Sequence, residues 1–558
     1  MKRQTMRLSF SARRRTAALV LGLSLAAGLA QLPVNARSVS EDFILPEPGG
    51  LVLHPIITSF SFSNQVTVSW WSPGGVSQLQ RASRLAPGDW QTIGQTTTNA
   101  TLTLAPDGDA GFLRLRTLPT FLSADECFFC HLDKYDAWSG TRHATAWETL
   151  ANIGQSTNPS CLKCHTAGFG MNSGYQDRRT TSHLAGVQCE NCHGPGGGHP
   201  AHPATTATQP IVSLSANACG GCHNGYHHPT FDEWKLSKHV KVVEDVAVGF
   251  LSTNATTSTS RMMACGPCHS GAVRVAMLAG VENGEPPVLP TGPDAAAVGV
   301  TCVVCHDPHQ DTDNGSQLRN PTFSLAPFSY RTSTNTTFAA QYKPEVNVCG
   351  QCHNMRGATW QDTSRYPHYS PQYNVLIGSG GFEGDTEPVQ SEHRNNPKQC
   401  ADCHTHRHTP DNLSPDNPVR TGHDFQVTLD ACAKCHEDGE TRKDLMELIQ
   451  GFTDRRLAAI KGLLDNWATT KAPQALRDKY GPRAWEYTTP GALSNPPGVP
   501  AVSGPTAQEQ AQVPDRIKQA RFNLYLVFQD KSRGIHNFGY ARHLLKVATD
   551  NVNAELAN

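Results

Sequence analysis

All 18 cysteines of this 558-residue chain belong to Cys-x-x-Cys-His motifs, and none is left over. Nine such motifs follow one another between residues 127 and 436. In chain order they are motif 1 (Cys127, Cys130, His131), motif 2 (Cys161, Cys164, His165), motif 3 (Cys189, Cys192, His193), motif 4 (Cys219, Cys222, His223), motif 5 (Cys265, Cys268, His269), motif 6 (Cys302, Cys305, His306), motif 7 (Cys349, Cys352, His353), motif 8 (Cys400, Cys403, His404) and motif 9 (Cys432, Cys435, His436). The use of every cysteine in one pattern indicates one common role.

The spacing within each motif indicates covalent haem attachment. Two thiols three positions apart can bond the two vinyl groups of one haem, and the adjacent histidine can bind the iron from one side. Disulfide frameworks and zinc sites also use paired cysteines, but neither explains a histidine after every pair. The sequence therefore predicts nine covalently attached haems c. The 18 cysteines are the predicted attachment points, and the nine motif histidines are the predicted proximal iron ligands.

The composition agrees with a core built partly from cofactor. Only 38% of the residues are hydrophobic, which is lean for a chain of this length. Nine macrocycles between residues 127 and 436 would supply apolar volume and would have to pack close together, as an electron conduit requires. The formal net charge is −1, so no basic field favours nucleic-acid binding.

The second, or distal, iron ligands are also expected to be histidines. A haem that only passes electrons usually has both axial positions filled, whereas a catalytic haem keeps one open. The predicted distal ligands are His143, His199, His239, His309, His368, His423 and His536. Weaker candidates are His183, His227, His228, His406 and His408, and no iron ligation is expected of His54 or His543. The similar segments Trp138–His143 and Trp234–His239 are interpreted as an internal repeat of ligand-bearing helices.

The first 36 residues have the pattern of an export signal. A basic start is followed by the apolar stretch 17–30 and by small residues before a plausible cut at Arg37. A short membrane anchor is the alternative, but the apolar run is shorter than the roughly 18 residues that span a bilayer. We therefore expect a mature chain without a transmembrane segment, in the periplasm or at the cell exterior.

The segments on either side of the motifs have different patterns. Residues 37–118 contain short alternating runs separated by turns, including 65–70, 101–104 and 112–116, which predict a small β-sandwich resembling a fibronectin type III module. Residues 441–558 are predicted to be helical, with a Pro-rich linker at about 489–514. Leu445, Leu448 and Leu457 belong to the apolar face expected to form core. The long helices could also pair two copies of the chain.

The chain resembles the multihaem cytochrome c superfamily. Residues 161–168 and 186–196 are similar to the central part of tetrahaem electron-transfer cytochromes, in which His143 and His199 match distal-ligand positions. Residues 534–537 are similar to the reductase members, where long helices mediate oligomer contacts. Hydroxylamine oxidoreductase, octahaem tetrathionate reductase and pentahaem nitrite reductase are further members. The resemblance implies a mainly α and irregular multihaem core over residues 119–440, with long C-terminal helices and the β-sandwich in front.

The predicted function is electron transfer through stacked, mostly bis-histidine haems between redox partner proteins. The alternative is a reductase or oxidoreductase of nitrite, hydroxylamine or a sulfur oxyanion, with one haem open. No motif has the lysine-ligated form Cys-x-x-Cys-Lys, which lowers the case for nitrite reduction of the pentahaem kind. A third possibility is a unit of a haem-wired surface assembly that is joined through the β module.

Overall fold

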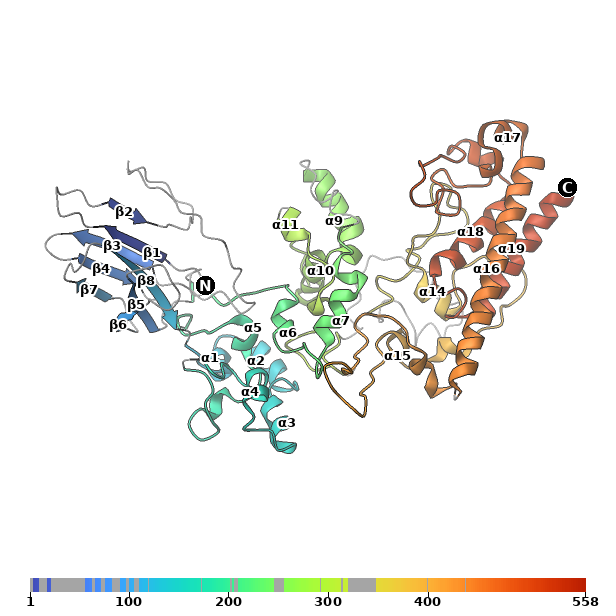
Figure 1. The fold of residues 1–558 in the computed structure, drawn as a ribbon. Coiled ribbons are helices and arrows are strands. Elements are labelled where there is room, and N and C mark those ends of the chain that lie inside the picture. Colours follow the sequence, from blue (N-terminus) through green and yellow to red (C-terminus); the bar gives the residue numbers. More distant parts are fainter. Residues whose placement is uncertain are drawn as a thin grey trace. The chain divides into compact units, whose positions relative to one another are not determined.

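A computed structural model describes the strands between residues 4 and 118 and most of the chain from residue 120 onward. The residues after 120 that it leaves undescribed are 172, 201–202, 205–208, 245–254, 292, 313–314, 320–347, 399 and 437. The structure divides into two compact units, Met1–Cys222 with Asp307–Gln317, and His223–His306 with Leu318–Asn558 (Figure 1). The predicted haem core of residues 119–440 is thus shared between both units.

The N-terminal strands of the first unit form two antiparallel sheets. The five-stranded sheet has the order β2-β1-β8-β5-β6 and the three-stranded sheet the order β3-β4-β7. The strands are β1 (Gln4–Ser9), β2 (Ala18–Leu21), β3 (Ile56–Phe62), β4 (Val66–Trp71), β5 (Val76–Ala82), β6 (Gln91–Thr96), β7 (Ala100–Leu104) and β8 (Ala110–Leu118). The three runs predicted as strands therefore lie in β4, β7 and β8. Each sheet contributes buried apolar side chains, Val68 from one and Leu79 and Leu113 from the other.

Strands β1 and β2 lie in the segment predicted to be the export signal. In β1, Gln4 pairs with Leu115 of β8, so this segment continues the five-stranded sheet. The cleavage expected at Arg37 would remove both strands from the mature chain and would leave β8 paired with β5 alone. His54 lies outside the described residues.

The rest of the first unit consists of short helices joined by hydrogen-bonded turns. They are α1 (Ala124–Phe128), α2 (Leu132–Ser139), α3 (Ala146–Asn152), α4 (Pro159–His165), η1 (Ser182–Leu184), α5 (Cys189–His193) and α6 (Asn217–Gly220). The segment Trp138–His143 was predicted to be a ligand-bearing helix, and this prediction is wrong for its second half. The Thr141 hydroxyl donates to the carbonyl oxygen of Trp138 at 2.7 Å and ends α2, so His143 lies in the turn before α3.

The second unit contains the longer helices. Its elements are α7 (Thr230–Leu236), η3 (Lys238–Val240), α9 (Ala255–His269), α10 (Gly271–Asn283), α11 (Pro293–Ala296), α12 (Cys302–Cys305), α14 (Gln372–Ile377), η5 (Glu392–Asn395), α15 (Cys400–His404), η6 (Leu429–Lys434), α16 (Gly439–Thr470), α17 (Gln474–Tyr480), η7 (Gly481–Arg483), η8 (Glu509–Gln512), α18 (Asp515–Asp530) and α19 (Phe538–Ala557). Within the described residues, no helix is both long and apolar enough to cross a membrane.

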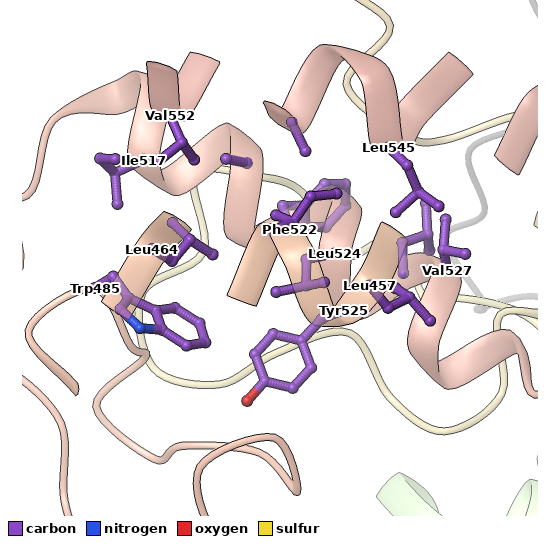
Figure 2. Packing of buried hydrophobic residues seen from close by; sticks show 14 of the residues in the cluster. Leu457, Leu464, Trp485, Ile517, Phe522, Leu524, Tyr525, Val527, Leu545 and Val552 are labelled. Atoms are coloured by element: carbon purple, nitrogen blue, oxygen red, sulfur yellow. The ribbon is translucent and has the colours of Figure 1, made fainter. Parts of the chain in front are cut away.

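Helices α16, α18 and α19 surround the largest hydrophobic core (Figure 2). Leu457 and Leu464 of α16 pack with Phe522 and Leu524 of α18 and with Leu545 of α19. Helix α16 begins at Asp438, whose carboxylate accepts a hydrogen bond from the N–H of Glu440 at 3.2 Å. The C-terminal helices are therefore held by apolar packing and a defined cap.

Two predicted core residues lie outside this packing. Leu445 and Leu448 are 39% and 64% exposed, because the first turns of α16 extend beyond the core that begins near Thr453. The predicted linker at about 489–514 is folded against the core. The N–H of Gly491 donates to the hydroxyl of Tyr525 at 3.1 Å, and Val513 is buried.

Candidate haem-binding site

The local backbone points the three functional side chains of a motif in one direction. In motifs 1, 6, 7 and 9 the histidine N–H donates to the carbonyl oxygen of the first cysteine at 2.9 Å, which closes one helical turn. Residues three and four positions apart share one face of such a turn. Both thiols and the imidazole therefore face the same side of the backbone. All 18 cysteines are described, and none of them forms a disulfide with another.

Several motif histidines are fixed through one ring nitrogen. The Nδ1 atoms of His165, His269 and His404 contact the carbonyl oxygens of Ala146, Val242 and Phe425 at 2.8, 3.0 and 2.8 Å. A carbonyl oxygen only accepts hydrogen bonds, so each Nδ1 must carry the proton. The Nε2 lone pair of each ring is then available to a metal.

Most motif histidines face a second imidazole from elsewhere in the chain. In the first unit, the ring centres of His131 and His199 lie 6.3 Å apart and those of His193 and His309 lie 6.0 Å apart. Both pairs are nearly parallel, with interplanar angles of 18° and 11°. The Gly-rich turn before His199 is closed by a bond from its N–H to the carbonyl oxygen of Gly196 at 2.8 Å.

The second unit contains five further pairs, most of them with steeply inclined rings. The pairs and the distances between their ring centres are His239 with His353 (6.2 Å), His269 with His368 (6.1 Å), His306 with His423 (6.2 Å), His404 with His536 (6.3 Å) and His436 with His393 (6.3 Å). Six of the seven predicted distal histidines thus face a motif histidine. His393 does so as well, although it was not predicted.

Three of the second imidazoles are uncharged at neutral pH, whereas at His536 the Asp530 carboxylate outweighs the effect of burial and raises the pKa. Burial lowers the pKa of His239 and of His368 to about 4, and it also lowers the pKa of His423. A neutral imidazole keeps the lone pair that metal binding requires. These three side chains therefore have the protonation state of ligands.

Neighbouring groups orient several of the second imidazoles. The Nδ1 atom of His393 donates to the carbonyl oxygen of Ile535 at 2.7 Å. Three others face side chains: His368 contacts the Ser370 hydroxyl at 3.0 Å, His423 the Thr421 hydroxyl at 3.0 Å, and His536 the Asp530 carboxylate at 2.6 Å. Such outer partners fix the ring and leave Nε2 facing the paired imidazole.

Motifs 2 and 4 differ from the other seven. At motif 2, burial and secondarily the neighbouring His165 lower the pKa of His143, and we do not assign a second ligand from this contact alone. For motif 4, the rings of His223 and His228 lie 6.4 Å apart. The N–H of Phe231 donates to the carbonyl oxygen of His223 at 2.8 Å and so closes a short loop that contains His228. This loop is too short to carry His228 around a macrocycle to the face opposite His223. We therefore do not assign His228 as a second ligand.

The internal repeat predicted from sequence extends to its hydrogen bonds. The indole N–H groups of Trp138 and Trp234 donate to the carbonyl oxygens of Val187 and Val300, each at 3.0 Å. In turn, the N–H groups of these valines donate to the carbonyl oxygens of His143 and His239 at 2.9 and 3.0 Å. Each valine lies two residues before a motif, motif 3 or motif 6. The same local structure thus presents His143 and His239.

Cysteines of different motifs lie side by side. Cys127 lies beside Cys189 and Cys164 lies beside Cys222 in the first unit. In the second unit, motifs 5 and 7 meet through Cys268 and Cys352, and motifs 7 and 8 meet through Cys349 and Cys400. The Cys352 sulfur also lies 3.8 Å from the carbonyl oxygen of Pro267. Groups attached to these thiols would have adjacent edges.

Comparisons with known proteins agree with this geometry. Residues 126–194 match the family described as cytochrome c554 and c-prime. The chain is 33% identical over 91 residues to cytochrome c-554 of Nitrosomonas europaea, covering 14% of this chain and 39% of that protein. It is 26% identical over 247 residues to the C-type polyheme cytochrome OmcC of Geobacter sulfurreducens, covering 41% and 28%. The chain belongs to the multihaem cytochrome c superfamily.

This multihaem cytochrome spans well under half the length of either curated relative. Its fold is similar to that of the outer cell wall cytochrome OcwA, with a TM-score of 0.50 and 17% identity over 77% of this chain and 99% of that one. At this level of identity the likeness concerns the fold alone.

The residues of this multihaem cytochrome fit haem c. A transition metal holds an imidazole nitrogen at about 2 Å, so two imidazoles on opposite sides of one iron have ring centres roughly 6 Å apart. The seven long-range pairs have this separation, and each includes one motif histidine beside two thiols. The donor set, neutral imidazole with thiols on the same face, is that of c-type haem attachment.

Proposed function

We propose that this multihaem cytochrome is an exported nonahaem electron-transfer protein with mostly bis-histidine irons. The proposal rests on one observation, that seven motif histidines face a second imidazole at 6.0–6.3 Å. Haem c supplies one-electron chemistry at its iron when both axial positions are filled. The chain contributes the ligands, their orientation and the spacing between sites.

The contacts between motifs support transfer rather than storage at isolated sites. Cys349 contacts Cys400 and Cys352 contacts Cys268, so motif 7 adjoins both motif 5 and motif 8. In the first unit, motif 3 adjoins motif 1 and motif 4 adjoins motif 2 in the same way. Sites that share edges in this manner exchange electrons without a mobile carrier.

Reductive coulometry of the purified holoprotein tests the proposal, after the haem number has been read from its intact mass. We expect nine covalent haems and the uptake of nine electrons for each molecule, as the nine motifs predict. Fewer attached haems would contradict the count. Export is tested separately: the N-terminus of the mature protein should be Arg37.

An enzyme with one open haem is the second candidate function, because the ring pairs assign a second imidazole to seven of the nine motif histidines. An iron with one open axial position could bind nitrite, hydroxylamine or a sulfur oxyanion. Turnover of one of these compounds with a reduced viologen, abolished by a change confined to motif 2 or motif 4, would favour the enzyme.

A further inference from the structure

The short loop between α18 and α19 serves two neighbouring motifs. His536 lies in this loop and faces His404 of motif 8. The carbonyl oxygen of Ile535, one residue earlier, accepts the hydrogen bond of His393, which faces His436 of motif 9. A single stretch of backbone therefore positions the second imidazole at both motifs.

The loop is held rigidly at both ends. Arg533 forms a paired contact with the carboxylate of Asp454 on α16. Gly534 adopts a φ of +95°, and a Cβ there would lie 2.7 Å from the Thr453 hydroxyl. At the far end, the Asn537 side chain caps α19 by accepting from the N–H of Tyr540 at 3.1 Å. The position of His536 is thus fixed by the fold.

His536 has a carboxylate within hydrogen-bond distance of its Nδ1, whereas the Nδ1 of His309 lies 3.8 Å from the carboxylate of Asp307. The Nδ1 of His536 lies 2.6 Å from a carboxylate oxygen of Asp530, whereas His368 and His423 face hydroxyls and His393 faces a carbonyl. The Asp530 side chain is completely buried. Among the described residues, His536 is its ionic partner, and the hydroxyl of Ser532 donates to its other oxygen.

We propose that Asp530 is a positioning residue that lowers the reduction potential of the iron bound between His404 and His536. This inference rests on the proposed function, because it requires that His536 binds iron. A buried carboxylate draws the Nδ1 proton toward itself and raises the electron donation of the imidazole. It also stabilises the more positive, oxidised state of the site by its charge. Hydroxyl and carbonyl partners do both less strongly.

The proposal makes the motif 8 iron lower in potential than the irons of motifs 5 and 9, whose second imidazoles have neutral partners at Nδ1. The transfer of an electron from the motif 9 iron to the motif 8 iron is therefore uphill. Cys349 and Cys400 place motif 8 beside motif 7.

The test is a redox titration of holoprotein followed by electron paramagnetic resonance, with haem content checked by mass. Asp530→Asn keeps the shape and removes the charge. We expect one iron to become easier to reduce by at least tenfold in its equilibrium constant, which is about 59 mV for one electron. Asp530→Glu should retain most of the low potential. Ser370→Ala, which removes a hydroxyl partner from His368, is the matched control and should leave the low-potential iron unchanged.

Ser532→Ala provides a measurement of opposite sign. Without the hydroxyl, the carboxylate of Asp530 interacts with His536 alone, so the same iron should become harder to reduce. The proposal is overturned if Asp530→Asn and Ser532→Ala, both with nine haems, leave every potential unchanged. His536→Ala separates this failure from the failure of the ligand assignment. If His536→Ala creates no high-spin iron, His536 is not a ligand, and the proposed function fails at this motif.

Discussion

The indole N–H of Trp234 donates to the carbonyl oxygen of Val300 at 3.0 Å, and the N–H of Val300 donates to the carbonyl oxygen of His239 at 3.0 Å. Two short bonds thus connect the segment that carries a second imidazole to the residues that precede motif 6. The same pair of bonds joins Trp138, Val187 and His143 before motif 3. The repeated unit therefore attaches a segment that carries a second imidazole to the motif that follows it.

Trp234→Phe should loosen this attachment. The ring is kept and one hydrogen bond to a backbone carbonyl is lost, so we expect the free energy of unfolding to fall by about 1 kcal/mol. His239 should also move from His353, which would convert part of one low-spin iron to high spin. Urea unfolding and electron paramagnetic resonance measure the two effects. A normal spectrum with normal stability would show that the bond has no role in presenting His239.

Gly299→Ala should have a stronger effect, because a Cβ at this position would lie 2.3 Å from the carbonyl oxygen of Val240. Gly186 is the equivalent residue of the first repeat, with 2.4 Å to the carbonyl oxygen of Ala144. We expect each alanine to lower the free energy of unfolding by roughly 1–3 kcal/mol through steric overlap. The control is Gly462→Ala in α16, where the Cβ meets open space. It should stabilise the helix by up to about 1 kcal/mol.

Glu190, inside motif 3, ties this motif to the segment leading into motif 1. Its carboxylate accepts hydrogen bonds from the N–H groups of Gly196 at 2.7 Å, Leu122 at 2.9 Å and Ser123 at 3.1 Å. Glu190→Ala leaves three backbone donors without this acceptor, and we expect a loss of roughly 3 kcal/mol. Glu190→Gln keeps one acceptor oxygen and should lose less. Equal stability of both variants and the wild type in urea would contradict the role.

Glu486 should make stability depend on pH. This carboxyl is buried and receives a hydrogen bond from the Tyr525 hydroxyl at 2.6 Å, and burial raises its pKa to about 7 from an ordinary value of 4.5. Because the folded state holds the proton more tightly, its contribution is complete below pH 4.5 and is lost as pH rises through 7. The difference is about 3 kcal/mol at most. In Glu486→Gln this part of the decline between pH 4.5 and 7 should disappear; an identical slope would refute the assignment.

The sequence specified the cofactor and left its second ligands only partly specified. Cys-x-x-Cys-His is a local pattern, so nine attachment sites could be predicted without a fold. The second ligands depend on tertiary contacts. His239 faces His353 of motif 7 and not the histidine of motif 5, which is nearer in the sequence, and no local pattern indicates this choice. His393 has no glycine-rich turn or repeated segment beside it, and only its contact with Ile535 and its place opposite His436 distinguish it.

The errors in secondary structure have local physical causes. The run around His143 reads as helical, but the Thr141 hydroxyl competes for the carbonyl oxygen of Trp138 and ends α2. Leu445 and Leu448 have helical spacing, and spacing alone does not indicate where the packing partner of a helix ends. The three alternating runs at 65–70, 101–104 and 112–116 lie in strands as predicted, because alternation is a direct consequence of strand geometry, whereas β1 and β2 were not predicted. The arrangement of the two sheets as a sandwich stays a prediction.

His393→Ala tests the unpredicted pair at motif 9. Removing this imidazole leaves His436 facing no second ring, so we expect one iron to become high-spin while nine haems stay attached. His408→Ala is the control, because it removes a histidine that is not paired with a motif histidine by ring contact in the described residues. High-spin iron in the control, or its absence in His393→Ala, would reverse the assignment.

The most direct measurement of the central claim is electron paramagnetic resonance of the fully oxidised holoprotein, with its haem content known. Paired imidazoles at seven motifs predict that low-spin ferric signals account for at least seven of the nine irons. High-spin signals confined to one or two irons would indicate open sites at motif 2, motif 4 or both, to which no second imidazole is assigned. High-spin signals from three or more irons would contradict the account, because the paired histidines would then not be iron ligands.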